Sequence, residues 1–439
     1  HNNMDNISSS NVQTPNTPER EKSAFSITSI LKKLGPGLIT GASDDDPSGI
    51  ATYSQVGAQF GLSILWTSLF SYPLMVAIQE ISARIGRISG RGIAGNIRHH
   101  YSLSLSFLVV GLMVIANVIN IGADIAAMGS SLKLLIGGPA LLYSVLFSVF
   151  SVYLQVFVPY RTYVNYLKWL TLVLFSYIIT AFMINMPWSQ AFLSAIKPSI
   201  ILKPEYLTSI TAILGTTISP YLFFWQSSQE VEELKINPEE IPVKKAPEQA
   251  GYHIKRIKVD TYIGMAFSNL IAFFIMLVAA TTLHTHGMRD INTAAEAAEA
   301  LRPFGGKFTF LLFSLGIVGT GLLSIPVLAG SAAYAVGETF HWKIGLNRKP
   351  NKAMNFYGII TAATLLGLVL DFSPINPIKA LYWAAIINGI AAVPIMIIMM
   401  LMSSNKKVMG EFTISRSLKL MGWISTIVMF LAAFGLIFS

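Results

Sequence analysis

Three consecutive acidic residues, Asp44, Asp45 and Asp46, precede Pro47 in an otherwise apolar stretch of the chain. In a membrane, a carboxylate at the centre of the hydrocarbon layer costs at least ~2.5 to 3.5 kcal/mol, so it normally has a partner or a task. Carboxylate oxygens are ligands that suit hard cations. Asp46 is the best placed of the three, because it adjoins a proline that interrupts a helix. The pattern indicates a cation site centred on Asp46.

Two interpretations of Asp46 remain open. Its carboxylate can bind a cation, or it can cap the following half-helix at Ser48 or Gly49, and one carboxylate can do both. For Asp44 and Asp45 we expect one side chain to line an aqueous vestibule and the other to face water.

A second interrupted segment, GTTISPYLFFWQSSQ, has Ser219 and Pro220 near its middle. Proline removes a backbone donor and glycine tolerates unwound backbone, so this segment and GASDDDPSGIATYSQ should each form two half-helices. Broken backbone at membrane depth survives only where it lines a site or a cavity. For Ser219, a ligand role and a hydrogen bond back to the freed backbone are equally expected.

The composition is that of a membrane protein. Of the 439 residues, 53% are hydrophobic and 12% are charged, against about 25% charged residues in a typical soluble protein. The chain has no cysteine, which excludes disulfides and thiolate metal clusters. It also lacks a phosphate-binding glycine loop, a nucleophile triad and a dinucleotide fingerprint, so we expect no enzyme activity, no cofactor and no nucleic-acid partner.

Apolar runs predict eleven transmembrane helices, each near the roughly 20 residues that cross a hydrocarbon core. We expect them at residues 35–58, 62–85, 104–130, 138–158, 164–186, 208–230, 260–283, 308–338, 354–370, 379–402 and 418–438.

The loops between these helices differ in charge. With a cytoplasmic N-terminus, the inner segments hold 24 of the 31 Lys and Arg residues, as the positive-inside rule requires. This bias predicts an integral protein of a bacterial-type plasma membrane, with its N-terminus cytoplasmic and its C-terminus outside. Residues 1–30 are polar and are expected to form a disordered cytoplasmic tail.

The two interrupted helices each begin a set of five. Because five is odd, the second set has the opposite orientation, and such paired breaks mark the binding site of many transporters. We therefore expect an all-α membrane protein with a transport core at 31–402, made of repeats at 31–186 and 208–402. A cytoplasmic loop and the eleventh helix follow at 403–439.

The run GPGLITGASDDDPSGIATYSQVGAQFG resembles the first helix of the NRAMP family of divalent metal transporters, whose hallmark there is Asp-Pro-Gly-Asn. QEISARIGRISGRG after the second helix, Asn269 in the seventh and AGSAAYAVGETF in the eighth are also similar to that family. The resemblance extends from about residue 35 to 402. It implies a LeuT-like fold of two inverted five-helix repeats plus one extra helix, with a metal site between the first and sixth helices.

Two departures from the family pattern change the expected cargo. The Asp-Pro-Gly-Asn motif reads Asp46, Pro47, Ser48 and Gly49 here, and the family's Met-Pro-His reads Ser219, Pro220 and Tyr221. Loss of the Met removes a soft thioether that favours transition metals, and loss of the Asn enlarges the site. Because Mg²⁺ tends to keep several waters, the pattern is most similar to NRAMP-related magnesium transporters. We expect Mg²⁺ as the cargo, with Mn²⁺ as a second candidate.

The resemblance also implies a set of ligands. Asp46, the Thr216 carbonyl and the hydroxyl of Ser219 or Thr217 are expected to bind the metal beside Gly49, with waters completing the octahedron. Gln226, Gln229 and Asn388 are expected to bind through water, and an interhelical hydrogen bond is the alternative for Asn388.

Proton coupling is expected to be weak or absent. Tyr221 replaces a family histidine on the proton path, and a tyrosine with an ordinary pKa of about 10 relays protons poorly near neutral pH. Asp124, in the third helix, either belongs to an ion pathway or pairs with a neighbouring helix.

Two alternative functions share these features. One is a proton-coupled importer of Mn²⁺ or Fe²⁺, and the other is a LeuT-like carrier of an organic solute, whose carboxylate Asp46 would repel. The His284 and His286 pair is interpreted as solvated loop rather than as a metal-collecting site. The expected partners are a divalent metal ion and the lipid bilayer, and the protein is expected to be a monomer.

Overall fold

Helices account for the regular secondary structure of the residues described by this computed structural model, which are 40–41, 44–167 and 169–436. The expected tail at residues 1–30 lies outside the described residues. The chain from Gly35 onward forms one unit, and the account below concerns that unit alone.

The bounds of the helices follow chain order. The α-helices are α3 Pro47–Phe60, α4 Trp66–Ser89, α5 Ile93–His100, α6 Leu103–Ile136, α7 Ala140–Phe157, α8 Tyr160–Leu167, α9 Phe175–Met183, α10 Trp188–Ile196, α11 Pro204–Thr217, α12 Pro220–Ile236, α13 Ala250–Thr282, α14 Ala294–Ala298, α15 Arg302–Gly305, α16 Thr309–Thr339, α17 Met354–Asp371, α18 Pro377–Ser403, α19 Lys406–Met409 and α20 Arg416–Gly435. The 3₁₀ turns are η1 Gly61–Ile64, η2 Leu170–Leu174, η3 Pro247–Gln249, η4 His284–His286, η5 Glu299–Leu301, η6 Gly306–Phe308 and η7 Pro350–Lys352.

The described residues contain nine helical segments that are long and apolar enough to cross a membrane, or ten with one bent pair. In that pair, Pro47–Ile64 and Trp66–Ser89 meet at 109°. The pair corresponds to the expected first and second helices, so the expected number of eleven is not confirmed. Part of the first expected helix, including residues 35–39, lies outside the described part of the chain.

Both predicted helix breaks are present. Helix α3 begins at Pro47, after Asp46 in an extended conformation. Helix α11 ends at Thr217 and α12 begins at Pro220. Each proline opens its helix, where its missing N–H group leaves no hydrogen bond unmade. Because α3 packs against α11 and α18, the two breaks lie in one region of the bundle.

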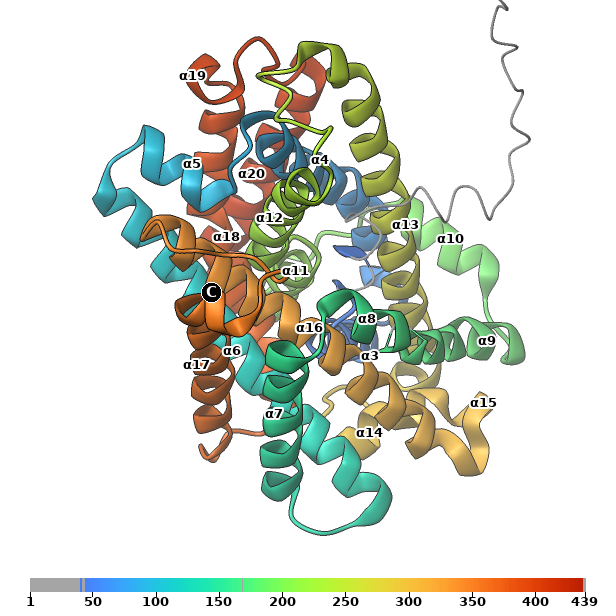
Figure 1. Ribbon diagram of the computed structural model, residues 1–439. Helices are drawn as coiled ribbons and strands as arrows, with labels where there is room; N and C mark the ends of the chain where they lie inside the picture. Colours follow the sequence, from blue (N-terminus) through green and yellow to red (C-terminus); the bar gives the residue numbers. More distant parts are fainter. Residues whose placement is uncertain (1–39, 42–43, 168, 437–439) are drawn as a thin grey trace, which may run out of the picture. The chain divides into compact units, whose positions relative to one another are not determined.

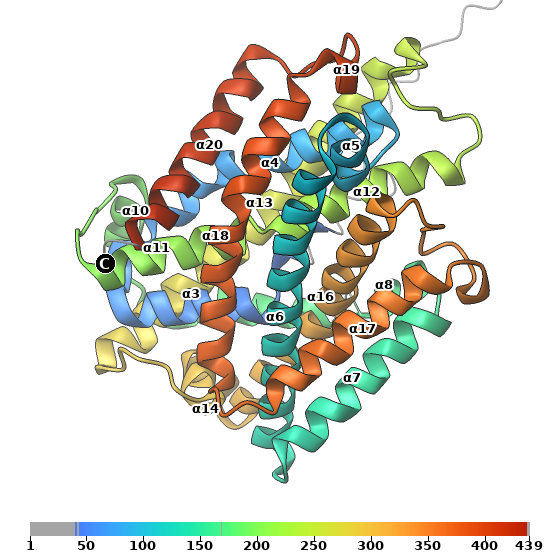
Figure 2. The ribbon, with the colours of Figure 1, turned by 90° about the vertical axis from the view of Figure 1, so that its left-hand side faces the viewer.

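The short helices α19 and α5 and the C-terminal end of α4 lie at one end of the bundle, away from α14 (Figures 1 and 2). Arg84 pairs there with Glu80, and Arg256 pairs with Glu230. Helix α16 reaches the same end, where the Glu338 carboxylate accepts hydrogen bonds from two backbone N–H groups at the start of α5. The loops predicted to lie on the cytoplasmic side therefore share one end of the bundle.

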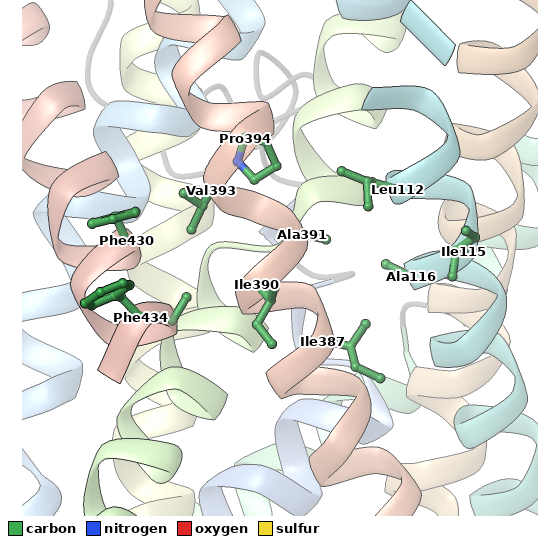
Figure 3. Close-up of a pocket in the computed structure, with 11 residues that line it drawn as sticks. Leu112, Ile115, Ala116, Ile387, Ile390, Ala391, Val393, Pro394, Phe430 and Phe434 are labelled. Atoms are coloured by element: carbon green, nitrogen blue, oxygen red, sulfur yellow. The ribbon is translucent and has the colours of Figure 1, made fainter. Parts of the chain in front are cut away.

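The side of the bundle formed by α6, α18 and α20 carries an apolar groove of about 520 Å³ (Figure 3). Side chains such as Ile115, Ile390 and Phe430 line it, and those labelled in the figure are all apolar. Such a surface suits hydrocarbon and offers no ligand for a cation.

Candidate metal site

Asp46 is the N-cap residue of α3, and its carboxylate accepts hydrogen bonds from the first turn of that helix. Asp46 Oδ1 accepts hydrogen bonds from the Gly49 backbone N–H at 2.8 Å and from the Ser48 hydroxyl at 2.6 Å. Asp46 Oδ2 accepts one from the Asn120 side-chain amide at 2.9 Å. An ionised carboxylate has about four acceptor positions, so Oδ2 keeps one for a further donor or a cation. The capping role of Asp46 is present, and it leaves room for a ligand role.

Asn120 of α6 links Asp46 to α18. Its side-chain oxygen accepts a weak hydrogen bond from the Asn388 amide at 3.4 Å. Asn388 is fully buried, and its own side-chain oxygen has no partner among the described residues. The interhelical hydrogen bond considered for Asn388 is therefore present. Asn120 was not among the predicted site residues.

The residues before the second break bond mainly to their own helix. The Ser219 hydroxyl donates to the Gly215 carbonyl at 2.7 Å and also lies 3.0 Å from the Thr216 carbonyl. The Thr217 hydroxyl donates to the Ile213 carbonyl at 2.6 Å. For Ser219, the hydrogen bond back to the freed backbone is thus the role seen here. The Thr216 hydroxyl is buried and has no partner within the described residues.

Gly49 faces this second break across a narrow gap. A Cβ atom added to Gly49 would lie 3.3 Å from Thr216 Oγ1 and 3.4 Å from Tyr53 Cε2. A side chain at position 49 would therefore enter the space between α3 and α11. Tyr53 extends along the same gap, since its hydroxyl lies 3.1 Å from the Thr217 hydroxyl.

Helix α12 carries the remaining predicted residues. Tyr221 and Gln226 are buried, and the Gln226 side-chain oxygen accepts a hydrogen bond from Thr40 at 2.5 Å. Gln229 lies against Tyr334 of α16. The side-chain nitrogens of both glutamines have no acceptor in the described part of the chain. Among the described contacts, neither glutamine is hydrogen-bonded to Asp46.

The other three aspartates of the predicted ion pathway are buried. Ser268 of α13 contacts both Asp44 and Asp45, so the expectation that one of them faces water is wrong for this conformation. Asp124 accepts a hydrogen bond from Ser324 of α16 at 2.9 Å. Asp124 follows Asn120 by one helical turn, which places both side chains on the same face of α6.

Oxygen and amide groups make up this site. Among the described residues, no group of three or more His, Cys, Asp or Glu side chains could hold a metal ion. The arrangement instead combines single carboxylates with hydroxyl, carbonyl and amide groups, which suits a cation that keeps part of its water shell.

The His284 and His286 pair does not form a joint metal site in this structure. His284 Nδ1 lies 2.7 Å from the Ala58 carbonyl, and His286 Nδ1 lies 2.7 Å from the Thr282 carbonyl. Each ring is held by a separate backbone group, in agreement with the loop interpretation.

A cavity of about 620 Å³ is lined by both polar and apolar side chains. Gln55 and Gln59 of α3, Glu205 of α11 and Tyr382 of α18 contribute to its wall, together with Asp290. Gln55 also holds the neighbouring loop, because its side-chain oxygen accepts from the Ile291 N–H at 2.9 Å.

Comparison with known proteins extends these observations to the whole chain. Residues 37–439 match the pattern of the family described as Nramp, natural resistance-associated macrophage protein-like. A Listeria innocua protein named divalent metal cation transporter MntH is 26% identical over 422 residues, which cover 92% of this chain and 88% of that protein.

Solved structures share the fold. A manganese transporter from Eremococcus coleocola superposes with a TM-score of 0.73 at 17% identity, covering 96% of this chain and 88% of that one. MhsT in complex with L-phenylalanine gives a TM-score of 0.58 at 14% identity, covering 90% and 98%. At such identities the likeness concerns the fold alone, which is LeuT-like.

Proposed function

The chain belongs to the Nramp family of divalent metal transporters, and from this premise we propose that it imports Mg²⁺ by alternating access with little or no proton coupling. The cargo would bind between the breaks that precede α3 and α12. Mn²⁺ is the second candidate cargo, favoured by the names of the relatives, which include a manganese transporter and the transporter MntH.

The observation that carries the proposal is the set of oxygen groups beside Gly49. The gap between α3 and α11 is bordered by the hydroxyl groups of Thr216 and Thr217, and the Asp46 carboxylate accepts from the Gly49 N–H. Hard oxygen donors favour Mg²⁺ over softer metals. With glycine at position 49, no side chain of that residue competes with the cargo for these oxygens.

We assign the direct contacts to Asp46 Oδ2 and the Thr216 carbonyl. The hydroxyl oxygens of Ser219 and Thr217 would bind through their lone pairs while the hydroxyl hydrogens stay on their backbone acceptors. Asn388, with its free side-chain oxygen, would contact the metal through water. The transported ion would reach Gln226 and Gln229 later on its path, since both residues lie in α12, beyond the break between α11 and α12. Asn120 would orient the Asp46 carboxylate.

The proposed route begins at the cavity between α3, α11 and α18. This cavity would face the outside, and the end of the bundle near α5 and α19 would face the cytoplasm, in keeping with the positive-inside rule. Tyr221, Asp124, Asp44 and Asp45 would border the path. Uptake would be driven by the ion gradient and the membrane potential, because Tyr221 is a poor proton relay near neutral pH.

Flux into liposomes tests this function. Purified protein should carry Mg²⁺ inward, and a pH-sensitive dye inside the vesicles should report no inward proton flux that depends on Mg²⁺. Transport limited to Mn²⁺, Fe²⁺ or Cd²⁺ would reject the proposed cargo. Metal-dependent acidification would reject the uncoupled mechanism and favour the proton-coupled alternative.

A further inference from the structure

A single hydroxyl lies between two buried carboxylates on the side of the break that faces α13. Ser268 Oγ is 2.6 Å from Asp44 Oδ2 and 3.1 Å from Asp45 Oδ1. A serine hydroxyl has one hydrogen to donate, so it satisfies one of these contacts at a time. If both carboxyl groups are ionised, the other contact brings two oxygen lone pairs together, which is unfavourable unless a proton on one carboxyl or a bound cation supplies positive charge there.

The other oxygen of each carboxyl group, Asp44 Oδ1 and Asp45 Oδ2, also lacks a positively charged or donating neighbour among the described residues. Asp44 is 1% exposed and Asp45 is 2% exposed. Buried polar atoms are nearly always hydrogen-bonded, and exceptions call for an explanation such as a bound ion.

Buried carboxylates elsewhere in the described chain are held in different ways. Glu80 pairs with Arg84 and Glu230 pairs with Arg256, whereas Asp124 accepts from the Ser324 hydroxyl and keeps one oxygen without a partner among the described residues. No Lys, Arg or His contact is present for Asp44 or Asp45 within the described residues. An ionised carboxylate left unpaired inside a protein costs several kcal/mol, and here two carboxyl groups share one hydroxyl.

We propose that Asp44, Asp45 and Ser268 form a second divalent-cation site, separate from Asp46. Two carboxylates match the charge of one divalent ion, and the ligands are hard oxygens that suit Mg²⁺ or Mn²⁺. Asp46 directs its own carboxylate to Gly49, Ser48 and Asn120, so the two sites share no observed hydrogen bond. The proposal rests on the proposed function only for the class of cation.

Two sites so close in sequence would not bind independently. Cations bound to carboxylates two residues apart repel each other, and this repulsion is strong where water is scarce. The second ion should therefore bind more weakly than the first. Its presence beside the cargo would lower the affinity of the Asp46 site and so ease release of the transported ion.

Ion counting tests the second site. The full-length protein, equilibrated with Mg²⁺ or Mn²⁺ at saturating concentration and separated from free metal, should hold two ions per chain by elemental mass spectrometry. The double variant D44N/D45N should hold one. Asp371→Asn, which changes a carboxylate of α17 in the same way, is the matched control and should keep both ions.

Two further variants separate the sites. Asp46→Asn should also leave one ion bound. Ser268→Ala should lower the affinity of the second site for its ion about tenfold, which corresponds to about 1.4 kcal/mol. If D46N keeps both ions while D44N/D45N loses one, the Asp46 site fails and the second site stands. One ion in the wild-type protein, or two ions in a D44N/D45N variant that melts at or above the wild-type temperature, would overturn the second site.

Discussion

Asp46 Oδ1 is fully used in holding the first turn of α3, whereas Oδ2 accepts only the Asn120 amide. The capping and ligand roles thus fall on different atoms of one carboxylate. A single alanine substitution would remove both and could not tell them apart. Asparagine can, because it caps a helix about as well as aspartate but has no charge.

Asp46→Asn should therefore remove the ion bound at Asp46 while leaving stability nearly unchanged. Asp46→Ala should remove the same ion and also lose about 1 kcal/mol through the missing cap. Isothermal titration with Mg²⁺ reports the first effect as one bound ion fewer than in the wild type, and the melting temperature of the detergent-solubilised protein reports the second. Equal melting temperatures for the two variants would show that the cap contributes little, and an unchanged number of bound ions in D46N would remove Asp46 from the site.

The space beside Gly49 gives a second prediction. In Gly49→Ala, the new Cβ lies 3.3 Å from Thr216 Oγ1, so it takes volume from the gap between α3 and α11. Mg²⁺ uptake should fall about fivefold more than Mn²⁺ uptake, or about 1 kcal/mol, since Mg²⁺ keeps more of its waters. Initial rates in liposomes measure this ratio.

A matched glycine provides the control. A Cβ added to Gly251 in α13 would meet nothing within 4 Å, so Gly251→Ala should leave both rates unchanged. An equal loss of Mg²⁺ and Mn²⁺ uptake in Gly49→Ala would mean that the gap does not distinguish the two ions by the number of waters they keep.

At the residue level, the sequence was informative where chemistry and backbone geometry coincide. The breaks next to Asp46 and Thr216 could be located from Pro47 and Pro220, whereas the ligand roles of these two residues stay predictions. Asn120 was missed, although its spacing of four from Asp124 places both on one face of α6. Ser268 was missed too, since an isolated serine in an apolar helix has no pattern that separates a packing role from a site role.

At the element level, interruptions marked by proline could be predicted, and others could not. The starts of α3 and α12 follow from Pro47 and Pro220. The expected helix at 164–186 is instead divided into α8, η2 and α9. No Pro or Gly lies between Tyr160 and Met183, so local sequence gives no sign of that division, which depends on packing against α13 and α16.

Helix α5 depends on a carboxylate from another element. Its first residues lack a capping side chain of their own, and Glu338 Oε1 and Oε2 accept from the Gly92 and Gly95 N–H groups at 2.9 and 2.7 Å. Glu338→Ala leaves two backbone donors unsatisfied and should cost about 1 to 3 kcal/mol. Hydrogen exchange should quicken at α5, and the melting temperature should fall.

Glu338→Gln separates charge from hydrogen bonding at this contact. The amide oxygen can still accept one hydrogen bond, so this variant should lie between wild type and alanine. Glu411→Ala, at an exposed position, is the control. It should change neither the hydrogen exchange of α5 nor the melting temperature. Unchanged exchange at α5 in Glu338→Ala would show that the helix start is held by packing instead.

At the scale of the whole molecule, the distribution of charged residues and the contacts between loops indicate the same set of loops at one end of the bundle. The loops predicted to be cytoplasmic are joined by contacts such as that of the Lys244 ammonium with the Lys407 carbonyl at 2.5 Å. Five of the six ion pairs of the described residues lie among these segments, and Arg302–Glu299 is the exception. The positive-inside rule then predicts which end faces the cytoplasm.

The absence of cysteine makes this orientation directly testable, because any introduced cysteine is the only thiol of the chain. Lys307 and Lys349 are exposed lysines in loops assigned to opposite ends. In intact cells, a membrane-impermeant maleimide should label Lys307→Cys and should label Lys349→Cys only after the membrane is opened. Both variants should transport Mg²⁺ at the wild-type rate, which checks that they fold. The reverse labelling pattern would invert the topology and turn the proposed import route into an export route.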